Sequence, residues 1–146
     1  MGTITTAMCS SFKQELLGGV HDLDTHTLKI ALIKVSPTGS YGAATTNYSD
    51  ITGNSDEATG TNYSAGGQTL DGASISLSGT TAFVDFTDEV FTNLTISARG
   101  AIIYNSSASN KAIAVFDFGS TVTSTSGDFT VVFPTADASN AVIRIA

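Results

Sequence analysis

Two aspartates and one arginine are the residues of this chain whose types and placement best suit chemistry. Asp85 alternates with aromatic residues in FVDF (83–86), and Asp117 lies in the similar segment VFDF (115–118). A pair of carboxylates is the machinery of general acid–base catalysis, as in glycoside hydrolysis. Arg99 lies between the two segments, and a guanidinium can bind a carboxylate through two parallel hydrogen bonds.

A structural role for these three residues is the favoured interpretation. Both aspartates fall within predicted strands instead of loops, where an arginine would neutralise charges that are costly to bury and would fix the strand register. The sequence therefore predicts a structural ion pair of Arg99 with Asp117 and Asp85. A glycan hydrolase built on Asp85 and Asp117 is the less favoured alternative. We expect a non-enzymatic protein with no catalytic residue.

Metal and cofactor sites are not expected either. His21 and His26 stand beside two aspartates in HDLDTHT, but their spacing matches no ligand signature. The acidic segment GNSDEATG (53–60) lacks the alternating oxygen ligands of a calcium loop. Cys9 is the one cysteine, so neither an intrachain disulfide nor a cysteine zinc site can form. The sequence has no nucleophile elbow and no glycine-rich phosphate loop between a strand and a helix.

One short helix is predicted over residues 5–17. Met8, Phe12 and Leu16 recur every four residues, and two glycines follow the segment. A helix of about three turns is too short to be stable alone in water. We therefore expect its apolar stripe to dock on a sheet.

Strands are predicted for most of the remaining chain. LKIALIKV (28–35) is apolar on both faces, as a central strand is. From residue 69 onward, short β-branched and aromatic segments alternate with turns such as SGT, TNL, SSASN and TSTSG. The segments are TLDGASISL, TTAFVDFT, NLTISARGAIIYN, KAIAVFDFG, GDFTVVFP and NAVIRIA. This pattern predicts one mostly-β domain over residues 1–146, an antiparallel sandwich or barrel with a short N-terminal helix.

Residues 36–68 form a long polar excursion, with one short edge strand expected near 46–51. Tyr41, Tyr48 and Tyr63 are its only large side chains. Tyrosine combined with Ser, Asn and Gly is the composition of adaptable contact surfaces, so the three rings are candidates for a protein- or glycan-binding surface. The alternative, in which the rings hold the excursion on its own domain, stays open.

The charge balance bears on partners. The net charge is −7, only 13% of the residues are charged, and the six basic residues form no run. Phosphate backbones need lysine or arginine to neutralise them, so a nucleic-acid partner is not expected. The longest apolar runs are far shorter than the ~20 residues of a membrane span, and the first residues lack the pattern of a signal peptide. We therefore expect no membrane partner.

The chain resembles small virion proteins of tailed bacteriophages. The similar segments run in order along nearly the whole sequence: KQELLGGVH, THTLKIAL, NYSAGGQTL, ARGAIIYN, AVFDFG, FTVVFP and NAVIRIA. The resemblance implies a virion structural protein made in the bacterial cytoplasm, which decorates the head as a cement protein or serves as a neck or tail accessory. It implies the major capsid protein or other virion proteins as partners, and brings no catalytic residue or cofactor.

The symmetry of viral shells adds an expectation about the oligomeric state. Shells have local symmetry axes, so a cyclic homo-oligomer, with a trimer favoured, suits a capsid decoration protein. A fibre accessory or a host-glycan adhesion module remains an alternative role for the same polar, tyrosine-bearing β domain.

Overall fold

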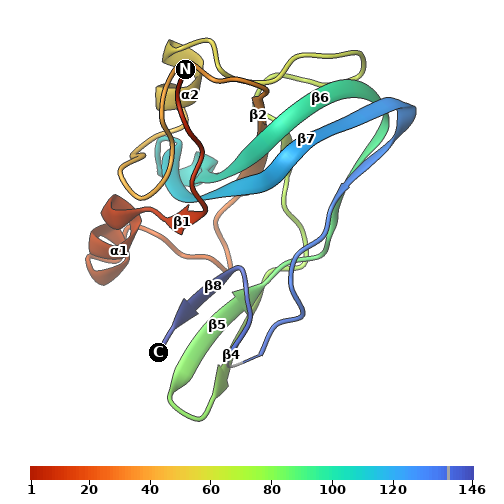
Figure 1. Ribbon diagram of the computed structural model, residues 1–146. Coiled ribbons are helices and arrows are strands. Elements are labelled where there is room, and N and C mark those ends of the chain that lie inside the picture. Colours follow the sequence, from red (N-terminus) through yellow and green to blue (C-terminus); the bar gives the residue numbers. More distant parts are fainter. Residues whose placement is uncertain (138) are drawn as a thin grey trace.

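Two antiparallel sheets make up most of the molecule, in the computed structural model that describes residues 1–137 and 139–146 (Figure 1). The five-stranded sheet has the order β1-β7-β6-β2-β3, and the three-stranded sheet has the order β4-β5-β8. The strands are β1 (Ala7–Met8), β2 (Leu28–Lys34), β3 (Gln68–Thr69), β4 (Ser74–Ser78), β5 (Thr81–Asp85), β6 (Glu89–Asn105), β7 (Lys111–Val131) and β8 (Ile143–Ile145). The helices are α1 (Ser10–Leu17), α2 (Ser49–Gly53) and the 3-10 turn η1 (Ser106–Ala108). The predicted mostly-β fold with a short N-terminal helix is confirmed, and its sheets stay open instead of closing into a barrel.

The central strand β2 was predicted correctly. It pairs with β6 on one side and β3 on the other, and its residues from Ile30 to Ile33 are fully buried. Its long β-branched and aliphatic run has apolar neighbours on both faces, as expected for a strand inside a sheet. One hydrophobic cluster contains residues of both sheets, including Leu32, Ile102 and Ile143.

Strands β6 and β7 form one long hairpin, where the sequence predicted shorter strands separated by turns. The expected turns TNL and TSTSG lie within the two strands, where the pairing shifts register between Phe91 and Leu94 and again between Leu94 and Ile96. Asn93 and Ser126 adopt positive φ angles there, of 49° and 47°. Turn residues have thus formed β-bulges, which bend the hairpin so that it curves over the molecule (Figure 1).

The predicted helix over 5–17 begins later than expected. Ala7 and Met8 form β1, which pairs with Val115 and Ala114 of β7, and the backbone N–H of Cys9 donates to Ile113. These sheet hydrogen bonds hold the chain extended up to Cys9, so the helix starts at Ser10. Periodicity alone does not reveal this, because an apolar residue suits an edge strand as well as a helix turn.

The edge strand expected near 46–51 is reduced to one isolated antiparallel bridge, between Asn47 and Lys111. From Ser49 onward the chain forms the short helix α2 instead of a strand. The carboxylate of Asp50 accepts from the backbone N–H of Thr46 at 2.8 Å, and the side chain of Asn47 accepts from the N–H of Ser49 at 3.0 Å. Asn and Asp side chains that accept hydrogen bonds from nearby backbone N–H groups favour a turn over a strand here.

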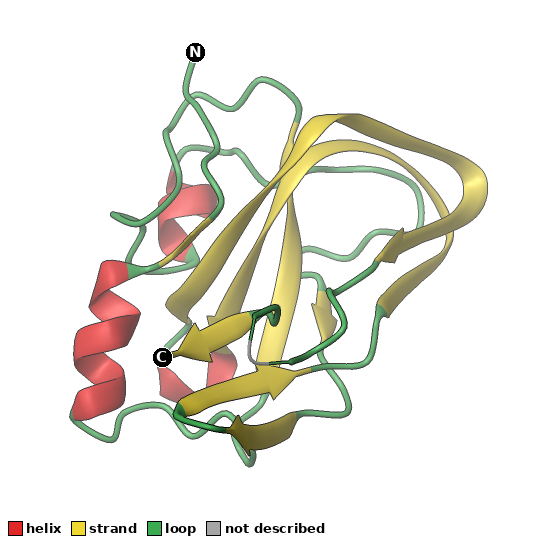
Figure 2. Cartoon of the chain, turned by 60° about the horizontal axis from the view of Figure 1, so that its bottom comes forward, coloured by secondary structure: helices red, strands yellow, loops and turns green. Residues whose placement is uncertain are grey.

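The three-stranded sheet lies against the open side of the long hairpin, with α1 beside it (Figure 2). Aromatic rings also pack together: the ring centroid of Phe86, just after β5, lies 6.1 Å from that of Phe133, just after β7. Within the β6–β7 hairpin, the centroids of the paired residues Phe91 and Phe129 lie 6.3 Å apart in an edge-on arrangement. Within the described residues, no helix is long and apolar enough to cross a membrane.

Candidate functional site

Arg99 and Asp117 meet on neighbouring strands. Asp117 stands opposite Gly100 in the pairing of β6 with β7, and Nε of Arg99 donates to Oδ1 of Asp117 at 2.9 Å. The hydrogen bond from Arg99, together with one from the N–H of Gly119, holds the pKa of Asp117 below its usual value. The two side chains are 39% and 26% exposed, so this is a surface ion pair and not the buried one that we expected. Exposed pairs contribute little to stability.

Asp85 does not take part in this ion pair. It lies on β5, opposite Ser74 in the three-stranded sheet, and within the described part of the chain Arg99 forms its ion pair with Asp117 and not with Asp85. The expected three-residue cluster is therefore wrong in its third member. The two carboxylates that the hydrolase alternative requires stand on different sheets.

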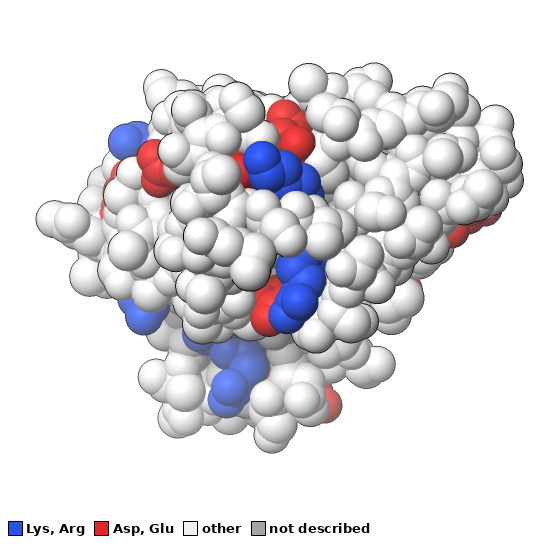
Figure 3. Space-filling model, turned by 45° about the horizontal axis from the view of Figure 1, so that its top comes forward, with Lys and Arg blue, Asp and Glu red and all other residues white. Residues whose placement is uncertain are grey.

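Charged groups are sparse on the face that Figure 3 shows, where blue and red atoms lie side by side in a mainly white surface. Among the described residues, basic side chains pair with carboxylates: Lys34 with Asp56, Arg99 with Asp117, and Lys111 with Glu15.

The three tyrosines of the excursion direct their hydroxyl groups inward. Tyr41 is only 4% exposed and donates to Asp56 at 2.5 Å. Tyr63 donates to Glu57 at 2.8 Å, and Tyr48 donates to the other oxygen of the same carboxylate. The burial of Tyr41 leaves it no contact surface, so the expectation is wrong for this ring. Tyr48 and Tyr63 are only half-buried, and their hydroxyl groups bind Glu57 within the domain.

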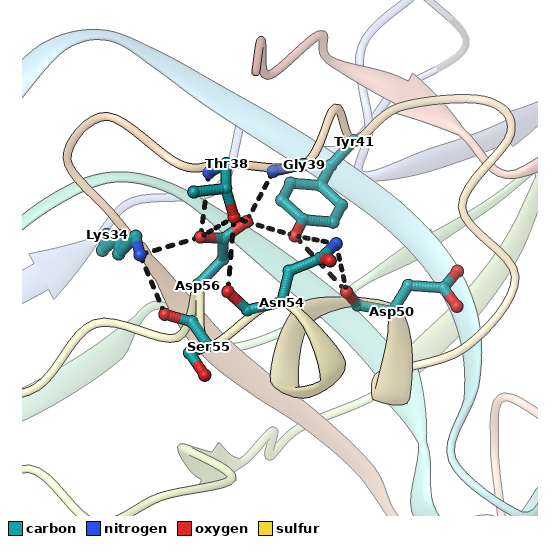
Figure 4. Close-up of polar contacts among 8 residues, drawn as sticks. All are labelled: Lys34, Thr38, Gly39, Tyr41, Asp50, Asn54, Ser55 and Asp56. Carbon is teal, nitrogen blue, oxygen red and sulfur yellow. Dashed lines mark hydrogen bonds and ion pairs between the residues drawn. The ribbon is translucent and has the colours of Figure 1, made fainter. Parts of the chain in front are cut away.

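The carboxylates of Asp56 and Glu57 each collect several hydrogen bonds, and Asp56 is the centre of the first of these two arrangements (Figure 4). Its side chain is fully buried and joins the start of the excursion to its middle. The carboxylate accepts hydrogen bonds from Thr38 N (2.9 Å), Thr38 Oγ1 (3.0 Å), Gly39 N (2.8 Å) and Tyr41 Oη, and it lies 2.9 Å from Lys34 Nζ. Such a set of donors compensates a buried negative charge.

The pKa of Asp56 reflects this competition. Burial alone raises the pKa of a carboxyl group, because it disfavours the charged form. Here the hydrogen bonds from Thr38, Tyr41, Gly39 and Lys34 outweigh burial and hold the pKa of Asp56 well below 3.8. The group therefore stays ionised at neutral pH and acts as a fixed anion inside the excursion.

Glu57 forms the second arrangement next to it in the chain. Besides the two tyrosines it accepts from the N–H of Gly66 at 2.7 Å. The ring of Tyr48 stacks on that of Tyr104, with centroids 4.5 Å apart, and the Tyr104 hydroxyl donates to the carbonyl of Gly66 at 2.6 Å. Two successive carboxylates thus fasten the two halves of the excursion to the five-stranded sheet.

The role of Asp56 and Glu57 was not predicted from the sequence, where GNSDEATG suggested them only as calcium ligands. A usable signal was present: in a chain with 13% charged residues, two adjacent acids lie in an excursion whose only large side chains are three tyrosines. Phenol hydroxyls are good donors to carboxylates in partly buried positions.

A pH titration of the tyrosines tests the inward orientation. Burial, followed by the bond to Asp56, raises the pKa of Tyr41 to about 12, and burial raises the pKa of Tyr104 to about 12. Burial also raises the pKa values of Tyr48 and Tyr63 above 10.0. A raised tyrosine pKa contributes stability that is present below pH ~10 and lost as the pH rises through the folded-state value. We expect no tyrosinate absorbance until about pH 11, where ionisation accompanies unfolding; normal titration near pH 10 in the folded chain would contradict this orientation.

The two histidines lie in a structural cluster around Asn105. The amide nitrogen of this fully buried side chain lies 3.0 Å from Nδ1 of His21 and 2.9 Å from Nδ1 of His26. An amide nitrogen only donates, so both Nδ1 atoms accept, and Nε2 of His21 carries a proton that it donates to Glu15 at 3.1 Å. Across residues 1–137 and 139–146, no three His, Cys, Asp or Glu side chains converge as metal ligands.

An apolar groove is open on the surface of the described residues. A groove of 370 Å³ lies between α1, the link after it and the three-stranded sheet. We call it the apolar groove; its main lining residues are Leu16, Leu23, Ile75, Val84, Ile143 and Ile145. Ile75 and Ile145 remain 55% and 50% exposed, and Leu77, two residues from Ile75 on β4, is 72% exposed. Clustered apolar exposure of this kind marks interaction sites.

Comparison of the chain with protein-family models, with curated proteins and with solved structures gave no match.

Proposed function

We propose that this chain is a non-enzymatic structural protein of a phage virion, and specifically a decoration protein that stabilises the head by binding across capsid subunits. The apolar groove is the observation that carries the proposal. It is an open, mainly aliphatic surface beside an exposed edge strand, suited to contact with another protein.

The polar side chains of the excursion support the same function. Asp56 and Glu57 are occupied by tyrosine hydroxyls and backbone N–H groups, so they act as internal fasteners of the domain. The host-glycan alternative relied on Tyr48 and Tyr63 as exposed stacking rings, and both rings are partly buried against the protein instead. The resemblance to small virion proteins gives the proposed location, and a contact surface gives the proposed mode of action.

The copy number of the protein in purified virions tests this proposal. Quantitative mass spectrometry relative to the major capsid protein is expected to give a value on the order of hundreds, in simple ratio to the shell, because decoration follows the symmetry of the capsid. A value of about a dozen or fewer would move the protein to the neck, tail or fibres. Absence from the particle would overturn the structural proposal.

A pair of matched variants tests the role of the apolar groove in the same particles. Ile145→Glu places a charge at the half-exposed rim of the groove, and Val90→Glu places one on β6 at a residue that is 41% exposed and does not line the groove. We expect Ile145→Glu to lower the copy number at least about tenfold, equivalent to 1.4 kcal/mol of binding, and Val90→Glu to leave it unchanged. Equal incorporation of both folded variants would show that this surface does not carry the binding.

A further inference from the structure

We propose that β4 pairs with β4 of a second copy of this chain, so that two three-stranded sheets join into one six-stranded sheet across a two-fold axis. The pairing concerns the outer edge of the three-stranded sheet, which Figure 2 places at the lower rim of the molecule. The pairing deepens the proposed function by naming a second copy of this chain as one partner of this apolar region. It is tested on the purified chain, so its outcome is independent of the location of the protein in a virion.

Strand β4 is an outer strand without the features that protect sheet edges. Natural sheets protect their outer strands by shortness, charge, proline or bulges. The outer strands β1 and β3 of the larger sheet are two residues long, and β8 carries Arg144. In contrast, β4 has five residues of sequence SISLS, pairs with β5 in continuous register, and is exposed along its whole length.

Strand β4 is also complementary to itself. Read in either direction, its sequence gives serine at positions one, three and five and an aliphatic residue at positions two and four. An antiparallel pair centred on Ser76 therefore places Ser76 opposite its own copy and Ile75 opposite Leu77. This register pairs all five residues and brings no charges together.

The two faces of the sheet fix the register of the pairing. Side chains alternate between faces along a strand, so Ile75 and Leu77 lie on one face, together with their partners Val84 and Ala82 on β5. A shift of one residue would turn the apolar face of one copy toward the serine face of the other. Centred on Ser76, the pairing instead joins the apolar grooves of the two copies on the same side of the six-stranded sheet.

The symmetry of this contact determines the size of the assembly. A strand that pairs with the same strand of another copy makes an isologous interface, which closes at two subunits. The expected assembly is therefore a dimer, in place of the trimer that shell symmetry alone suggests. The unpaired N–H and C=O groups of the two edges supply the hydrogen bonds, and Ile75 and Leu77 supply the apolar contact.

Cysteine cross-linking tests both the pairing and its register. The native Cys9 is fully buried, so the wild-type chain provides a silent background. We expect purified Ser76→Cys to form an interchain disulfide under mild oxidation, because opposite residues in an antiparallel pair have Cα atoms about 4.5–5.5 Å apart. Ser74→Cys and Ser78→Cys are each expected to stay monomeric on denaturing gels, yet to cross-link when mixed, because Ser74 lies opposite Ser78 of the partner copy.

Two measurements complete the test. Ser120→Cys, on an exposed position of β7 in the other sheet, should not cross-link. Sedimentation equilibrium should give a mass of twice 14.9 kDa for the wild type and for Val90→Lys, and a single-chain mass for Leu77→Lys, which places a charged side chain opposite the apolar Ile75 of the partner copy. A wild-type monomer or trimer, or cross-linking of Ser120→Cys as fast as Ser76→Cys, would overturn the proposed dimer. Failure of the virion measurement would leave these outcomes unaffected.

Discussion

Asp56→Asn is expected to lower the free energy of unfolding by about 3–5 kcal/mol, the range observed when one partner of a buried ion pair is removed. The amide occupies nearly the same volume, but it replaces one acceptor oxygen with a donor NH₂ group. Around Asp56 the backbone N–H groups of Thr38 and Gly39, the Tyr41 hydroxyl and the Lys34 ammonium all donate. At least one donor must then face another donor within the protein.

Thermal unfolding measures this loss. For a chain of this length, 1 kcal/mol corresponds to about 2–4 °C, so the expected fall in Tm is on the order of 10 °C. Asp24→Asn is the matched control, because Asp24 is an exposed aspartate and its substitution should change stability by no more than about 0.5 kcal/mol. Equal Tm values for the two variants would show that the buried carboxylate does not hold the excursion in place.

The pH dependence of the Tm difference between wild type and Asp56→Asn follows from the linkage between proton binding and folding. The pKa of Asp56 is lower in the folded than in the unfolded chain, so its contribution is present above the unfolded value of about 3.9 and is lost as the pH falls below it. The Tm difference between wild type and Asp56→Asn should therefore be constant above about pH 5 and become smaller below pH ~4. A difference that widened on acidification would contradict the ionised state of Asp56.

Local sequence was informative where one physical cause dominates. LKIALIK forms the buried central strand because almost every side chain in it is apolar, which leaves no solvent face to choose. The polar segments TNL and TSTSG were different. Their residues suit turns and bulges equally well, and only the opposing strand decides between the two. For the same reason Ala7 and Met8 joined a sheet whose partner residues lie more than a hundred positions away.

The side-chain arrangements were harder to predict than the strands. Arg99 and Asp117 were placed together correctly because they flank one hairpin, whereas Asp85 depends on how two separate sheets are arranged. The three tyrosines have the composition of a binding surface, but the acids that capture their hydroxyls lie up to fifteen residues away. Composition shows which groups are available to bond, and tertiary structure decides whether the partner lies inside or outside the molecule.

This arrangement separates the parts of the molecule that hold the fold from the part that carries the exposed apolar groove. The excursion uses carboxylates and tyrosines to fasten an irregular chain that has few apolar residues of its own. The three-stranded sheet leaves aliphatic side chains exposed on its face and its outer edge. A substitution in the excursion should therefore act first on stability, and one on β4 or at the rim of the apolar groove should act first on assembly.

Gly67→Ala is expected to have the largest effect of any single methyl group added to the excursion. Gly67 has a φ of 75° and lies where the excursion returns to the sheet, just before β3 pairs with β2. A Cβ atom on this residue would overlap the carbonyl group of Ile30 in the centre of β2. The Cβ position is fixed by its own backbone, and the atoms it would overlap belong to the backbone of Ile30. Removing the overlap therefore requires β3 to move away from β2, which also displaces the hydrogen bonds of Gly66 to Glu57 and Tyr104.

We expect this substitution to cost about 4 kcal/mol or more, which lies in the range of the most damaging single changes. Gly19→Ala is a close control, because Gly19 has a φ of 74° and its added methyl group would meet no atom within 4 Å. The control should lose only the roughly 1–2 kcal/mol of a left-handed alanine. Chemical denaturation of both variants gives the two values, and their difference isolates the steric overlap from the backbone conformation. Equal losses would mean that the excursion rests loosely on β2, in which case Glu57 and its tyrosines would not be fastening it to the sheet.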